Sequence, residues 1–165
     1  MNKLYLCFLL ILLSLGCKKS FDPANPDTDQ FISLVKKGNH DPYQLPRFNA
    51  SHIDRLLELA KDTSHIAGYP GNPISSKSSL PAPDGRRYLI LSECLLWTVE
   101  GIRNGSGYGS LNPLLIVPGE IPTSLQAKEI LEVREKYQKS WESTGKSITQ
   151  WSSVNPLQST IYRWF

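Results

Sequence analysis

A chain of 165 residues, 40% of them hydrophobic, is long enough for one domain with its own hydrophobic core. The formal net charge of +3 is close to balance and does not indicate a nucleic-acid partner. The three cysteines and three histidines are not grouped at metal-ligand spacings, so we expect no metal site and no cofactor.

The N-terminal residues follow the order of a secretory signal peptide. Lys3 supplies the positive charge, residues 4–13 form an apolar run, and small residues follow. As a helix, the apolar residues 4–15 would span roughly 18 Å, which is less than the hydrocarbon core of a bilayer, about 30 Å. We therefore expect residues 1–16 to be a signal peptide and not a membrane span.

The end of this segment resembles the lipobox of bacterial lipoproteins. Leu15, Gly16 and Cys17 match that motif, and the resemblance implies that the peptidase cuts before Cys17 and that this cysteine carries the lipid. Ser14 departs from the pattern, because the family usually has leucine there, and a plainly cleaved signal peptide is the alternative. Since several acyl chains hold a protein firmly on a bilayer, the resemblance implies an exported lipoprotein whose anchor binds the membrane.

The residues after Cys17 indicate the membrane to which the lipoprotein would be sorted. In many bacteria an aspartate at this point retains a lipoprotein at the inner membrane, whereas here Lys18 and Lys19 follow, which favours the outer membrane. The absence of an acidic run favours its periplasmic face over the cell surface. Residues 17–27 contain two prolines and few apolar side chains, so we expect a lipidated tether followed by a single domain over residues 28–165.

Helical periodicity recurs along this domain, and the third helical stretch is apolar almost all round, which places it at the centre of the protein. A run at 114–117 reads equally well as a brief strand or a packed loop. The sequence therefore predicts a mostly α domain of about four main helices around a central apolar helix, with irregular Pro/Gly-rich loops. A solenoid-like stack is a minor alternative. The predicted helices run from Pro26 to about Lys37, from Asn49 or Ser51 to about Ala60, from about Arg86 to Arg103, and from Thr123 to about Trp141.

Two carboxylates lie on the predicted central helix. Glu93 and Glu100 share one face and lie about 10.5 Å apart along the axis. A buried carboxylate must be paired or protonated. The two are either an acid/base pair in a pocket under Trp97, or structural groups that each bind a backbone amide, a tyrosine or an arginine such as Arg103. The structural interpretation is favoured.

Cys94 lies on the same predicted helix. If Cys7 leaves with the signal peptide and Cys17 is lipidated, Cys94 has no partner for an intramolecular disulfide. Its leucine and tryptophan neighbours favour burial in the core over a role as a nucleophile.

The stretch "YPGNPISS", residues 69–76, combines turn-forming residues with one apolar side chain. Tyr69, Asn72, Ile74, Ser75 and Ser76 are therefore candidates for a partner-binding loop. The alternative is a structural corner, which such stretches form more often.

Three stretches together resemble a known family. "SHIDRLLELAKDTSHI", "GNPISS" and "LLWTVEGIR", within residues 30–117, resemble an uncharacterised domain family found in lipoproteins of gut-type, Bacteroidetes-like bacteria. The resemblance implies a periplasmic or surface lipoprotein and carries no activity with it. With no catalytic constellation evident, the sequence predicts a lipid-anchored, non-enzymatic module that binds another envelope protein. The alternative is a small hydrolase or ligand-binding domain that uses the carboxylates of the central helix.

Overall fold

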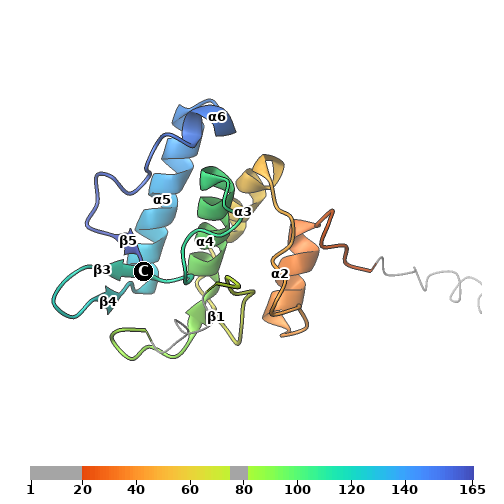
Figure 1. Ribbon diagram of the computed structural model, residues 1–165, viewed down its shortest axis with the longest axis horizontal. Coiled ribbons are helices and arrows are strands. Elements are labelled where there is room, and N and C mark those ends of the chain that lie inside the picture. The colour runs from red at the N-terminus through yellow and green to blue at the C-terminus, as the bar shows by residue number, and fades with distance from the viewer. Residues whose placement is uncertain (1–19, 75–81) are drawn as a thin grey trace, which may run out of the picture.

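The computed structural model describes residues 20–74 and 82–165 (Figure 1). Cys17, Ser75 and Ser76 lie outside the described residues. The described part contains five α-helices, one 3₁₀ turn and five short strands. In chain order these are α2 (Thr28–Lys36), η1 (Ala50–His52), α3 (Ile53–Leu59), β1 (His65–Ile66), β2 (Leu89–Ile90), α4 (Leu91–Asn104), β3 (Leu115–Val117), β4 (Thr123–Ser124), α5 (Ala127–Ser143), α6 (Ile148–Trp151) and β5 (Arg163–Trp164).

The first two helical segments begin at polar caps. The Asp27 side chain accepts the Gln30 N–H and starts α2 at Thr28, two residues after the predicted start at Pro26. Asn49 starts the next segment in a capping box, because its N–H donates to His52 Nδ1 while its side chain accepts a backbone N–H. One stripe of α2 is buried: Phe31, Ile32 and Val35.

Helix α4 is the centre of the core. Every residue from Leu91 to Gly101 is buried, and α3 and α5 both pack against this helix (Figure 1). The helix begins at Leu91 and not near Arg86, because the two preceding residues form β2 and pair with β1. None of the described helices is long and apolar enough to cross a bilayer.

The prediction of a mostly α domain is wrong. Strands β1 and β2 form one antiparallel sheet, and a second antiparallel sheet has the order β4-β3-β5. In the second sheet Ile116 lies opposite Ser124 on one side and Arg163 on the other. The strands have two or three residues each, which is too short for an alternating pattern to show in the sequence. The protein is a small mixed α/β domain.

The three-stranded sheet includes the C-terminal end of the chain, which is rich in aromatic residues. Strand β5 pairs with β3, which resolves the ambiguous run at 114–117 as a strand. The sheet lies beside α5, at the opposite end of the domain from α2 and the N-terminal segment (Figure 1). The C-terminal strand is thereby joined to the same core as the central helix.

Candidate functional site

Glu93 is fully buried near the start of α4, and both of its carboxylate oxygens are bonded. Arg86 Nη2 donates to Oε2 at 2.5 Å, and the backbone N–H of Leu115 donates to Oε1 at 2.6 Å. The Arg86 guanidinium also lies over the Tyr88 ring, 5.5 Å from its centre. Glu93 therefore joins the segment before α4 to strand β3.

Burial is the largest influence on the Glu93 carboxyl and raises its pKa to about 7. The charge of Arg86 and the N–H of Leu115 oppose this rise without cancelling it. Glu93 consequently changes its protonation near neutral pH while held inside the core.

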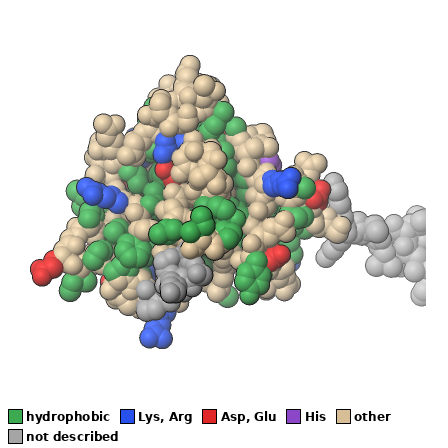
Figure 2. Space-filling view, viewed as in Figure 1, with side chains coloured by type: hydrophobic (Ala, Val, Ile, Leu, Met, Phe, Trp, Pro, Cys, Tyr) green, Lys and Arg blue, Asp and Glu red, His purple; other side chains and the backbone are tan. Residues whose placement is uncertain are grey.

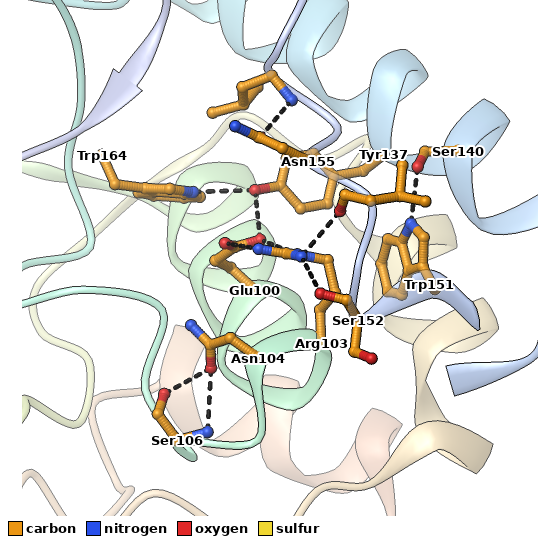
Figure 3. A network of polar contacts seen from close by, with 12 residues as sticks. Glu100, Arg103, Asn104, Ser106, Tyr137, Ser140, Trp151, Ser152, Asn155 and Trp164 are labelled. Atoms are coloured by element: carbon orange, nitrogen blue, oxygen red, sulfur yellow. Dashed lines mark hydrogen bonds and ion pairs between the residues drawn. The ribbon is translucent and has the colours of Figure 1, made fainter. Parts of the chain in front are cut away.

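Glu100, two turns further along α4, is held by an arginine and a tyrosine (Figure 3). Arg103 makes two bonds to its carboxylate, Nε to Oε2 at 2.8 Å and Nη2 to Oε1 at 2.6 Å. The Tyr137 hydroxyl donates to Oε2 at 2.8 Å and accepts a bond from Trp164 Nε1 at 2.9 Å. This network joins α4 to α5 and to β5.

Arg103 also reaches the chain after α6. Its Nη1 donates to the backbone carbonyls of Ser152, at 3.1 Å, and Val154, at 2.8 Å. The structural interpretation expects such partners. Glu93 binds an arginine and a backbone amide, and Glu100 binds an arginine and a tyrosine. Both carboxylates thus connect elements that are far apart in the sequence.

Cys94 lies between these carboxylates on the same helix and is completely buried. Burial raises the pKa of its thiol well above the usual value. The thiol therefore lacks the low pKa and the exposure that a nucleophile needs.

The predicted binding loop divides into buried and exposed parts. Tyr69 belongs to the core, since its ring is buried and its hydroxyl is 2.7 Å from Thr98 Oγ1. Asn72 is a corner residue: its amide donates to the Ser110 carbonyl at 3.2 Å, and its Oδ1 accepts the Ile74 N–H. Ile74 is 83% exposed.

Three loops are hydrogen-bonded to one another at this corner. The Gly71 N–H donates to the Pro42 carbonyl at 3.3 Å, and Asn72 reaches Ser110 in the third loop. We call this region the three-loop surface and define it as residues 41–48, 69–74 and 105–113.

Each loop of the three-loop surface carries one large exposed apolar side chain. Tyr43 is 86% exposed, Ile74 83% and Leu111 50%. The connecting residues are Pro42, Asn72 and Ser110, and each lies within two positions of one of these side chains. The three exposed side chains are therefore carried by loops that are hydrogen-bonded to one another. Hydrophobic side chains gather on the face of the molecule shown in Figure 2.

The glycine-rich loop is seated tightly on α4. Trp97 Nε1 donates to both oxygens of Ser110, at 3.0 Å to Oγ and 3.2 Å to the carbonyl. A Cβ on Gly109 would lie 2.5 Å from the Trp97 carbonyl oxygen, and one on Gly101 would lie 2.7 Å from the backbone of Gly107. Glycine is required at both positions because the two backbones approach so closely.

A groove of about 280 Å³ separates the first and third loops of this surface. Among the residues that the structure describes, its lining is mostly apolar, with Arg47 as the one charged residue, and contains neither Glu93 nor Glu100. The lining residues are Leu45, Pro46, Arg47, Phe48, Thr98, Ile102, Gly107 and Tyr108. The groove suits an apolar group better than a polar substrate.

Sequence reasoning missed Tyr43, Leu111 and the groove. A weak signal existed for Tyr43, an aromatic residue between two prolines in a segment with no helical or strand periodicity. Leu111 follows a run of glycine and serine, where a single leucine has no pattern to place it. Within residues 20–74 and 82–165, no cluster of three or more histidine, cysteine, aspartate or glutamate residues could hold a metal ion.

Comparison with known protein families assigns most of the chain to a family. Residues 22–165 match the model of a family described as "Domain of unknown function (DUF4943)". This supports the resemblance to an uncharacterised domain family, whereas the lipobox and the bacterial group stay predictions. No curated protein and no solved structure is significantly similar to the chain.

Proposed function

Because the chain belongs to the DUF4943 family, whose function is unknown, we propose a function from the site itself. The protein is a lipid-anchored envelope protein whose domain is a non-enzymatic module that binds another envelope protein. Cys17 carries the lipid, and the anchor sits in the outer membrane with the domain on the periplasmic side. The partner is bound by the three-loop surface.

The observation that carries this proposal is the exposure of Tyr43, Ile74 and Leu111 on three connected loops. Exposed apolar residues held together on one surface typically mark a protein–protein contact. Interfaces favour large apolar and aromatic residues at their centre and a few arginines. The three-loop surface has this composition, with Arg47 in the groove beside it.

The carboxylates favour a binding module over an acid/base enzyme. Glu93 and Glu100 are occupied by Arg86, Arg103 and Tyr137 and do not line the groove. A general acid or base must come within hydrogen-bond reach of a substrate. Both side chains would have to give up their ion pairs before they could act on one.

The proposal is tested by capture of the partner from cells. Ile74→Asp combined with Leu111→Asp places two charges on the three-loop surface without disturbing buried groups, since both side chains are exposed. The tagged protein is cross-linked in intact cells and purified, and co-purifying proteins are quantified by mass spectrometry. We expect the principal partner of the native protein to fall by tenfold or more in this variant.

Ile121→Asp is the matched control, because Ile121 is 72% exposed but lies outside the three-loop surface, close to β4. It should leave capture unchanged. Equal capture by the native protein and the double variant, at an unchanged melting temperature, would refute the proposed surface.

A further inference from the structure

The segment that follows the proposed lipid site is packed on the domain. The Phe21 ring stacks on Phe31, with centroids 5.8 Å apart. The Arg47 N–H donates to the Pro23 carbonyl at 2.8 Å, and Asp22 bonds the backbone of the next turn. Most of the predicted tether is therefore fixed in place from about residue 21 onward.

This packing limits how far the domain can move from a lipid on Cys17. Fully extended, the chain from Cys17 to Phe21 spans at most about 14 Å, and from Cys17 to Pro23 at most about 21 Å. A domain of this length has a radius of gyration of about 15 Å. Even at full extension, the chain between Cys17 and the packed Phe21 is thus shorter than the domain that it carries.

The fixed segment also decides which side of the domain lies near the bilayer. Pro23 is bonded to Arg47, which lines the groove of the three-loop surface. The three-stranded sheet, near Ile121, lies at the opposite end of the domain (Figure 1). The groove is accordingly on the membrane-proximal side, and the sheet is on the distal side.

From this geometry we infer that the three-loop surface works at the bilayer and that its partner is a protein embedded in the same membrane. The inference rests on the proposed function, since it requires both the lipid on Cys17 and the binding surface. An apolar segment of the partner, emerging from the bilayer, enters the groove next to Arg47.

The charges favour a protein over the lipid surface itself as the occupant. A surface that binds anionic lipid carries a cluster of several lysines or arginines. Here Lys18, Lys19 and Arg47 are positive, but Asp22 and Asp27 belong to the same N-terminal part of the chain and are exposed. Mixed charges around an apolar groove suit a protein segment better than a layer of anionic headgroups.

The test lengthens the tether. A flexible insertion of 12 Gly/Ser residues between Lys19 and Ser20 is introduced into the full-length protein, and capture in intact cells is measured as above. Because effective concentration falls as roughly the −3/2 power of linker length, capture should drop on the order of tenfold. The captured partner should stay in the membrane pellet after alkaline carbonate extraction.

Three results would overturn the inference. Capture could be unaffected by the insertion, or the partner could be released by carbonate as a soluble protein. In the third, a fluorophore at Leu111 of the purified acylated protein would be quenched by lipid that carries a nitroxide deep in its acyl chain, in phosphatidylethanolamine/phosphatidylglycerol vesicles that contain no other protein. Quenching at that depth requires insertion of the surface into the hydrocarbon core, which would make the lipid itself the occupant.

Failure of the inference is separable from failure of the proposed function. The mass of the N-terminal peptide reports whether Cys17 is acylated, and the Ile74 and Leu111 double variant reports whether the surface binds a partner. An unmodified Cys17 refutes the anchor and the inference together. An acylated protein whose capture depends on Ile74 and Leu111 but not on the tether refutes the inference alone.

Discussion

Glu93 and Glu100 are the same residue type on the same helix, but their carboxyl groups differ in solvent exposure and in their partners. Glu93 has no exposed surface, and burial raises its pKa in spite of Arg86. The Glu100 side chain keeps 10% of its exposure and accepts three bonds, two of them from Arg103. Each carboxylate therefore connects elements of the fold. We expect its replacement to change the stability of the domain more than the binding of a partner.

Replacing Glu100 by glutamine should destabilise the domain. The change removes the charge that Arg103 and Tyr137 face, and breaking a largely buried ion pair costs about 3 kcal/mol. Urea denaturation followed by tryptophan fluorescence measures the loss. Glu58→Gln is the control, because Glu58 pairs with Arg55 in solvent, and it should change the free energy of unfolding little. If Glu100→Gln is as stable as the native protein, the network is not a structural connection.

Glu93 should make stability depend on pH. Its pKa in the folded protein, about 7, lies above the value of 4.5 for the free side chain, so between these values the folded state binds more protons than the unfolded state. The contribution of Glu93 to stability is therefore full below about pH 4.5 and is lost as the pH rises through 7. The advantage of the native protein over Glu93→Gln should shrink from pH 5 to pH 8 in urea denaturation. An advantage that grows over this range would contradict the raised pKa.

The elements differ in how well the sequence predicts them. Helix α4 could be predicted because its apolar residues extend over several turns. Strands β1 and β5 have two residues each, and their partners lie far along the chain, so neither local pattern nor turn chemistry indicates them. The sequence predicts Arg86 at the start of a helix, two turns before Glu93. Because the chain is extended at β2, Arg86 instead folds back onto Glu93.

The close contact between the glycine-rich loop and α4 can be tested by substitution. Gly109→Ala adds a Cβ 2.5 Å from the Trp97 carbonyl oxygen, so the loop must move away from α4. Such overpacking costs about 1–3 kcal/mol. Gly119→Ala is the control, since its nearest neighbour would be 3.6 Å away. Thermal melting of both variants measures the difference, and equal melting temperatures would show that the loop is not held as described.

At the scale of the molecule, buried polar connections and the exposed surface are separate. The ion pairs of Glu93 and Glu100 hold the helices and the sheet, whereas the groove and the exposed apolar residues lie on the three-loop surface. The sequence indicates only part of this surface: of the predicted binding residues, Ile74 is exposed and Tyr69 is buried, and the prediction does not include Tyr43 or Leu111. The three loops are connected by hydrogen bonds between segments that are distant in the sequence, and no local pattern contains this information.

The most direct test of the three-loop surface is site-specific photo-cross-linking in intact cells. A photoreactive amino acid is placed in turn at Tyr43, Ile74, Leu111 and Ile121. The account predicts that the first three positions yield the same cross-linked envelope protein and that position 121 yields none. Cross-links from position 121 alone, or different proteins from each of the first three positions, would contradict a single binding surface made of three loops.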